Sequence, residues 1–387
     1  MNESILEAKS VAYPEPNMSA LRALAVELGV DAVVAITPEN VVYASNVFLM
    51  SPGLRTRQPF VILPAAREPI ALVATTEYRQ MLDESWIKDV RSYVEFAKDP
   101  ADALAEVLIE VGLDRGSIGI EFDYLSAKSH GQLSRKMPEA KFIDTGKSIA
   151  SIRAVKSEDE VRLLEKIAKQ THRAVLDAMS ASRLGETERV MANRIVDGIV
   201  NGGADGMRFV IFASGPRTRY NHASPTDRVP LKSEIIRFDV GGKYGAWGSD
   251  FARTYSTGEP TSLQRDTYRK LWDIHTATIN TVRPGMAAEE PYFFCKKQFE
   301  NAGLELTMSH IGHSFGIEAH ESPMIRPGEK TKLKAGMVIN IEPGVTDAAG
   351  TVYHLEDLFV VTDQGPRLLT LGFAPREIPI IGEPIRV

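Results

Sequence analysis

Two aspartates lie on either side of a glycine-rich turn in the segment IIRFDVGGKYGAWGSDFARTYST. The β-rich runs around this turn predict a hairpin in which Asp239 and Asp250 fall roughly opposite each other. Two carboxylates that face each other across paired strands repel unless a cation lies between them. Because Asp239 follows the apolar residues of a strand, a metal ligand is favoured over an exposed turn acid.

Histidines gather in the segment SHIGHSFGIEAHESP, which holds His310, His313 and His320 although the whole chain has 8 histidines. Neutral imidazole is a good ligand for divalent transition metals. A lone histidine is more often a core or surface residue. Three so close together, among glycines that allow close backbone approach, favour a metal or catalytic site.

Two glutamates interrupt apolar runs, Glu342 in MVINIEPG and Glu356 in YHLEDLFVVT. A buried carboxylate needs a partner, so either each faces a cationic side chain or one metal pair serves both. Four carboxylates and one imidazole form a hard donor set, which favours a bridged pair of Mn, Co, Fe or Zn. The single cysteine, Cys295, cannot build a thiolate site.

The elements that must position these residues fall into two domains. Residues 1–153 alternate helical stretches with short β-rich runs, which predicts an α/β domain with a largely covered sheet. A capping box at Ser157 and Glu160 then opens a long amphipathic helix, and we assign residues 154–387 to a second domain. A pair of helices around RLGETERV is followed by strands, and a second pair around RPGMAAEE is again followed by strands. This repeat predicts that both helix pairs lie on one side of a shared, mainly antiparallel sheet.

The composition of the chain limits the kinds of molecule that it is expected to bind. The chain has 387 residues with 45 Lys+Arg and 51 Asp+Glu, a net charge of −6, and no basic stripe. Nucleic acid and anionic membranes are therefore not expected as partners. With no signal-type N-terminus and no run of eighteen apolar residues, we expect a cytoplasmic protein.

In order and spacing these residues resemble the pita-bread metallohydrolases, which include Xaa-Pro dipeptidases (prolidases), Xaa-Pro aminopeptidases and methionine aminopeptidase. The NVVYASNVF stretch is similar to the creatinase/prolidase N-terminal domain, and RAVKSEDEV is similar to the prolidase entry into the catalytic domain. The resemblance implies an α/β N-terminal domain joined to an α+β pita-bread catalytic domain. It argues against methionine aminopeptidase, which generally lacks the first domain.

The same resemblance implies two divalent metal ions and a role for each ligand. Asp239 would hold one metal ion, and Asp250 and Glu356 would bridge both. His313 and Glu342 would complete the second. The family also implies a homodimer.

Catalytic roles are implied in the same way. His222 in NHASPTDR and His320 in AHESP match two histidines that contact the substrate without binding metal. Glu342 would accept a proton from the attacking water and pass it on. His222 and His320 would steady the developing oxyanion or protonate the leaving nitrogen.

Two departures from the family pattern lie beside the ligands. Ser314 follows His313 where glycine is usual, which would narrow the site. His354 stands two positions before Glu356, where an arginine commonly braces the ligands. A histidine there predicts metal binding that is weaker or more dependent on pH.

A third departure concerns the substrate carboxylate, which prolidases grip with an arginine just after the H-E-x-P segment. Here Met324 holds that position, and Arg326 lies two positions further on. We expect Arg326 to face the cleft, because guanidinium offers the bidentate geometry that a carboxylate requires. The alternative is a solvated arginine in a turn.

The sequence thus predicts a dinuclear metal-dependent hydrolase of a small peptide or amide, with the Xaa-Pro bond as the favoured target of a dipeptidase or aminopeptidase. The alternative is a hydrolase of a small non-peptide C–N bond, as in creatinase and ectoine hydrolase, which share this fold. Creatinase works without metal and has lost ligands, whereas this chain keeps all five. A binding module without activity would not need them.

Overall fold

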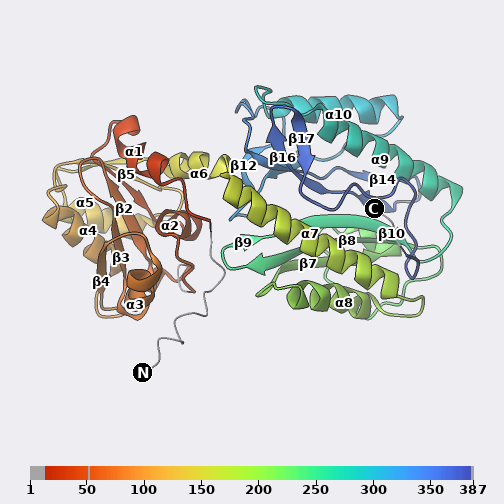
Figure 1. Ribbon diagram of the computed structural model, residues 1–387, viewed down its shortest axis with the longest axis horizontal. Helices are drawn as coiled ribbons and strands as arrows, with labels where there is room; N and C mark the ends of the chain where they lie inside the picture. The colour runs from red at the N-terminus through yellow and green to blue at the C-terminus, as the bar shows by residue number, and fades with distance from the viewer. Residues whose placement is uncertain (1–13, 51–52, 385–387) are drawn as a thin grey trace. The chain divides into compact units, whose positions relative to one another are not determined.

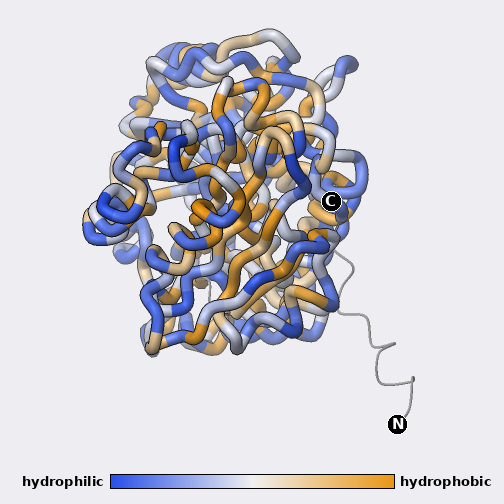
Figure 2. Tube along the Cα trace, turned by 90° about the vertical axis from the view of Figure 1, so that its left-hand side faces the viewer, coloured by the Kyte–Doolittle hydropathy of each residue, from blue (hydrophilic) through white to orange (hydrophobic). Residues whose placement is uncertain are grey.

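The computed structural model describes residues 14–50 and 53–384. The chain divides into two compact units, Met1–Arg153 and Ala154–Val387, which we call unit 1 and unit 2 (Figure 1). No helix in the described ranges is long and apolar enough to cross a membrane. Figure 2 shows hydrophobic segments concentrated in the interior and hydrophilic segments on the outside.

Unit 1 is built on a six-stranded sheet with the order β4-β3-β2-β1-β5-β6. The β-rich runs of the sequence form strands, as expected. Strand β4 is an additional strand that was not predicted from the sequence. Its sequence, DVRSY, buries only the tyrosine fully, because the strand lies at the edge of the sheet. The strands are β1 (Ala32–Ala35), β2 (Phe60–Pro64), β3 (Ile70–Ala74), β4 (Asp89–Tyr93), β5 (Ser117–Ile120) and β6 (Lys141–Asp144).

Helices flank the strands of this sheet along the chain, and buried residues of α4 and α5 form one core with the sheet. Leu104 and Leu108 of α4 contribute side chains that are 0% exposed to that core. The elements are α1 (Met18–Leu28), α2 (Pro38–Ser45), η2 (Arg55–Arg57), α3 (Thr75–Glu84), α4 (Pro100–Glu110), α5 (Ala127–Lys136) and α6 (Gly146–Ala154).

The first half of unit 2 begins with the predicted capping box. The Ser157 side chain accepts from the backbone of Glu160, and the Glu160 side chain accepts from the backbone of Ser157. The elements are α7 (Glu158–Ala181), α8 (Glu188–Asn201), β7 (Gly206–Ser214), η3 (Gly215–Arg219), β8 (Ile235–Tyr244), β9 (Trp247–Gly248) and β10 (Phe251–Ser256).

The second half repeats the pattern of a helix pair followed by strands, as the sequence predicts. The elements are α9 (Ser262–Thr281), α10 (Glu289–Asn301), β11 (Gly312–Ser314), β12 (Glu321–Met324), β13 (Val338–Ile341), β14 (Gly344–Thr346), β15 (Val352–His354), β16 (Asp357–Thr362) and β17 (Gly365–Leu368). In Figure 1 α9 and α10 lie above the strands of unit 2, α8 lies below them, and α7 crosses in front of them.

The strand pairing of unit 2 differs from the single shared sheet expected from the sequence. It is antiparallel but falls into separate ladders, β10-β8-β7 with β9, β12-β11-β13-β16-β17, and β14-β15. A side chain joins two of them, because the Thr254 hydroxyl accepts from the His354 N–H and donates to the His354 carbonyl, at 2.9 Å each. The Thr254 hydroxyl is thus one of the side-chain contacts that join the two halves of unit 2 where a continuous backbone ladder was expected.

Candidate metal centre

The two aspartates come from the β8–β10 hairpin. Asp239 lies in β8 and pairs with Ala252, while Asp250 immediately precedes β10. The two carboxylates are therefore diagonal neighbours rather than directly opposite. Because side chains alternate along a strand, Asp250 and Ala252 share a face with Asp239, and the predicted proximity is retained.

The two glutamates come from the ends of neighbouring strands in the second half. Ile341 of β13 pairs with Asp357 of β16. Glu342 follows Ile341 and Glu356 precedes Asp357, so the same register carried one residue further sets the glutamates opposite each other. The Asn340 side chain donates a hydrogen bond to one oxygen of Glu356.

His313 of β11 connects the two carboxylate pairs. Its Nε2 lies 3.4 Å from Glu342 Oε1 and 3.9 Å from Asp250 Oδ2. Its Nδ1 lies 3.1 Å from the carbonyl oxygen of Ser314, which can only accept, so the proton belongs on Nδ1. Nε2 then presents its lone pair toward the carboxylates, as a metal ligand requires. Burial lowers the pKa of His313 to about 4, which keeps the ring neutral near pH 7.

The charge balance of this cluster points to cations. Burial, reinforced by the charges of the neighbouring carboxylates, raises the pKa of Asp250 and of Glu356 well above the ordinary range, and burial also raises that of Asp239. One oxygen on each of Asp239, Glu342 and Glu356 is buried without a hydrogen-bond partner. Unpaired buried oxygens beside repelling carboxylates are what a hard divalent cation satisfies, so the donor set fits such a group.

Glu342 differs from the other three carboxylates. Burial acts to raise its pKa, but a hydrogen bond from His354 and the charges of His313 and His310 outweigh that effect and lower the pKa to about 2. His354 Nε2 lies 3.6 Å and His310 Nε2 lies 3.7 Å from the Glu342 carboxylate. Glu342 is therefore the most readily ionised acid of the group.

A cavity of about 940 Å³ opens onto the cluster. Asp239, Asp250, His313 and Glu342 line it, whereas Glu356 is buried behind them at 1% exposure. The remaining lining residues combine an apolar wall, several polar groups and two arginines: Phe209, Val210, Ile211, Arg219, Asn221, His222, Arg237, Thr307, Met308, Ser309, His310, Ala319, His320, Gly344, Val345, Thr346, Val352 and His354.

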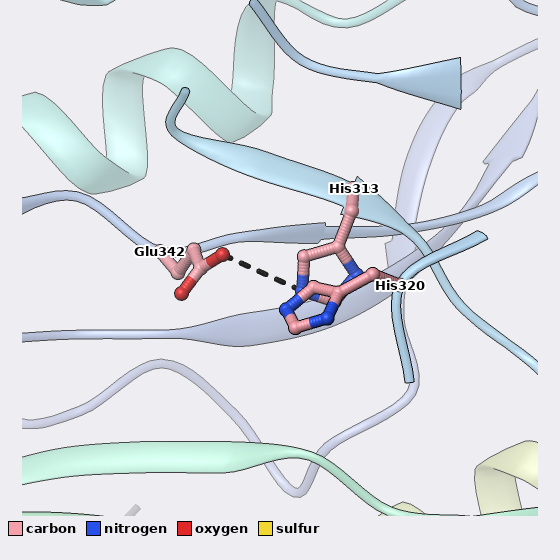
Figure 3. A group of neighbouring side chains, drawn as sticks. All are labelled: His313, His320 and Glu342. Carbon is pink, nitrogen blue, oxygen red and sulfur yellow. Dashed lines mark ion pairs between the residues drawn. The ribbon is translucent and has the colours of Figure 1, made fainter. Parts of the chain in front are cut away.

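Both candidate substrate-binding histidines, His222 and His320, are exposed and line this cavity. The rings of His320 and His313 have centroids 4.3 Å apart, and Figure 3 shows them side by side with Glu342 facing them. Among the residues that the structure describes, two triads lie close enough to hold an ion, His313 with His320 and Glu342, and Asp250 with His313 and Glu356. The assignment of His320 to the substrate rather than to the metal thus remains a prediction.

The structure does not bring Arg326 to this cavity. Its side chain is exposed just beyond β12 and is not among the lining residues. The preceding Ile325 is 0% exposed, whereas Arg326 is exposed in the bend that follows β12. The expectation that Arg326 faces the cleft therefore has no support in the described structure.

Sequence reasoning missed Arg253, which lies behind the cluster and is 3% exposed. Its guanidinium donates to the Glu356 carbonyl and, at 2.6 Å, to Asp357 Oδ1, and it lies 4.0 Å from the Phe251 ring centroid. It thereby ties β10, next to Asp250, to β16, next to Glu356. An arginine in the middle of a buried strand was the available signal.

Fold and site together define a metallohydrolase, and comparisons with known proteins specify the family. Residues 161–363 match the family model described as Metallopeptidase family M24, and residues 18–155 match the Creatinase/Prolidase N-terminal domain. The chain belongs to this metallopeptidase family.

Relatives of known name cover nearly the whole chain. An Xaa-Pro dipeptidase of Lactobacillus delbrueckii subsp. lactis is 28% identical over 357 residues, which are 90% of this chain and 95% of that protein. The prolidase structure from Pyrococcus furiosus is 26% identical with a TM-score of 0.78 and covers 90% of this chain and 98% of its own. An X-Pro aminopeptidase from Thermotoga maritima, 23% identical over 92% of this chain and 99% of its own, shares the fold with a TM-score of 0.80.

Proposed function

We propose that this chain hydrolyses the peptide bond before proline, as an Xaa-Pro dipeptidase or aminopeptidase. The observation that carries the proposal is the cavity wall formed by Asp239, Asp250, His313 and Glu342, with Glu356 behind it. The Xaa-Pro dipeptidases among the relatives support the substrate class. Homodimer formation and a cytoplasmic location belong to the same proposal.

The five candidate ligands would hold two divalent ions, Mn, Co, Fe or Zn. The Asp250 carboxylate neighbours both Asp239 and His313, which supports its assignment as a bridging ligand. A bound pair of such cations supplies Lewis acidity and charge neutralisation to a hydrolytic site. The ligand oxygens that lack hydrogen-bond partners support this assignment.

The chain's own groups supply the proton transfers. Glu342 is ionised over the working pH range, and its carboxylate would accept a proton from water. His320 and His222 line the cavity beside it and would donate to the developing oxyanion or to the leaving nitrogen. Phe209, Ile211 and other apolar residues form a wall that suits a proline ring.

A second candidate is the hydrolysis of a small non-peptide C–N bond. It gains support because Arg326, the residue expected to grip a dipeptide carboxylate, lies outside the cavity. The metal cluster alone serves either substrate class.

The proposal is tested by assaying metal-replete enzyme on Xaa-Pro dipeptides, Xaa-Pro tripeptides, matched Xaa-Ala peptides, and small cyclic or guanidino amides. Cleavage confined to the bond before proline is expected. Hydrolysis of the non-peptide amides alone would replace the peptidase assignment with the second candidate. Equal turnover of Xaa-Pro and Xaa-Ala peptides would refute the proline preference.

A further inference from the structure

We propose that Arg219 selects substrates that carry a free carboxylate on the residue leaving the metal centre. This inference rests on the proposed function and deepens it, because it favours dipeptides over longer peptides. Arg219 lies at the end of η3 and lines the cavity that contains Asp239 and His313. Arg219 is not one of the candidate metal ligands, and it lies at a different position from Arg326.

The cavity has two permanently charged cations among its described lining residues, Arg219 and Arg237. Arg237 is 6% exposed, and its terminal nitrogens donate to the carbonyls of Thr218 and Tyr220 at 3.3 Å and of Asn221 at 3.2 Å. Those donors are therefore committed to the backbone of the 218–221 loop. Arg237 holds this loop in place, and Arg219 remains as the cation available to a ligand.

The loop is also fixed from its other side. The Thr218 hydroxyl, 0% exposed, donates to the Gly215 carbonyl at 2.8 Å and accepts from the Val352 N–H at 3.1 Å. The residues before and after Arg219 are thus held by independent contacts. A side chain that emerges from an anchored loop loses less freedom when it binds a ligand, which favours recognition.

The Arg219 side chain is itself oriented but not neutralised. Its Nε donates to the Pro216 carbonyl at 2.8 Å, the side chain is exposed, and no acid of the described residues forms an ion pair with it. Its neighbour Arg217 differs, because it pairs with the buried Glu188. With Nε occupied, the two terminal nitrogens of Arg219 remain for a planar anion, and a carboxylate matches them in a bidentate pair.

The cavity therefore offers three kinds of contact in one place. The scissile amide would lie beside the candidate metal ligands, an apolar group would pack against the wall of Phe209 and Ile211, and an anion would pair with Arg219. A dipeptide that ends in proline carries these three groups within one small molecule. A longer peptide places an uncharged amide where the carboxylate of the dipeptide would lie.

The test compares Arg219→Ala, Arg219→Lys and Arg326→Ala with the unmodified enzyme. Arg326→Ala is a matched control, since it removes an exposed arginine outside the cavity. Each variant is assayed on an Xaa-Pro dipeptide and on its C-terminal amide. Arg219→Ala should lower kcat/KM for the dipeptide about 10- to 100-fold, mainly through KM, and should leave the amide nearly unchanged. Arg219→Lys should recover part of the loss.

A binding measurement separates this inference from the proposed function. Isothermal titration of metal-replete protein with N-acetylproline and with N-acetylprolinamide requires no cleavage. Tighter binding of the acid that Arg219→Ala abolishes and Arg326→Ala preserves would support the inference, even if no Xaa-Pro peptide is cleaved. Equal losses on acid and amide, or a carboxylate-specific loss in Arg326→Ala instead, would overturn it.

Discussion

His354 contacts Glu342 at two points, since its Nε2 lies 3.0 Å from the Glu342 carbonyl oxygen and 3.6 Å from Glu342 Oε2. The β14–β15 ladder sets His354 opposite Gly344 and so holds the ring beside the glutamate. The sequence marked this histidine as a departure from the family arginine. In the structure the histidine still braces a candidate ligand.

Replacing His354 should therefore weaken metal binding. We expect His354→Ala to lower metal affinity about 10- to 100-fold, the usual effect of removing a group that orients a ligand. Competition with a fluorescent chelator measures the affinity. His130→Ala, on the exposed face of α5, is the control. Unchanged affinity in His354→Ala would show that the contact does not orient Glu342.

Metal content tests the ligand set directly. Metal-replete protein should contain about two divalent ions per chain, and Asp250→Ala should lose most of both because Asp250 is the candidate bridging ligand. Elemental analysis by mass spectrometry gives the count. Asp363→Ala removes an exposed aspartate between β16 and β17 and should retain full content. Metal-free protein with undiminished activity after chelation would disprove the metal centre.

Metal content should also distinguish the two cavity histidines, His222 and His320, from the candidate metal ligands. His222→Ala and His320→Ala should keep their metal and lose turnover about a hundredfold or more, as expected for groups that act on the reacting substrate. His320 is the sharper test, because it lies close enough to His313 and Glu342 to bind an ion. Loss of metal from His320→Ala would make it a ligand, and full turnover in either variant would make that residue structural.

The buried ion pair behind the cluster should matter for stability. Arg253→Met leaves Asp357, which is 0% exposed, without its charged partner and should cost about 3–5 kcal/mol of unfolding free energy. Denaturant unfolding of the metal-free protein measures this without interference from metal loss. Arg376→Met breaks the exposed pair with Asp273 and should have little effect. Similar losses in both variants would contradict the buried role.

The gain in stability on metal binding should depend on pH. The folded-state pKa values of Asp250 and Glu356 lie above their ordinary values of 3.8 and 4.5, so the metal-free fold keeps protons that the unfolded chain releases. The contribution of these two groups to stability is therefore fully present at low pH and is lost as pH rises toward the raised values. Added Mn²⁺ should raise the melting temperature more at about pH 8 than at about pH 5.5. An equal gain at both would refute the raised pKa values.

Sequence alone predicted the parts of the site that depend on local pattern. The hairpin around Asp239 and the capping box at Ser157 follow from periodicity and turn residues. Glu342 and Glu356 were expected inside apolar strands, whereas they lie just beyond the ends of β13 and β16. The direction of a single exposed side chain does not follow from such patterns. Arg326 is exposed and lies outside the cavity, next to the fully buried Ile325.

Contacts between distant segments of the chain also could not be predicted from the sequence. The anchoring of the 218–221 loop depends on Arg237, in a strand that follows the loop, and on Val352, far along the chain. The joining of β10 to β15 depends on one hydroxyl, that of Thr254. Such pairings appear only when tertiary structure brings the two segments together, since neither segment carries a local signal for its partner.

The division of the candidate ligands between the two repeats has a consequence for synthesis. Asp239 and Asp250 leave the ribosome well before His313, Glu342 and Glu356. A nascent chain therefore passes through a stage in which it exposes an acidic hairpin that no second sheet yet opposes. Cations captured at that stage would be held by only two carboxylates and could exchange freely. The proposed five-residue ligand set is complete only after the second repeat has been translated and has packed against the first.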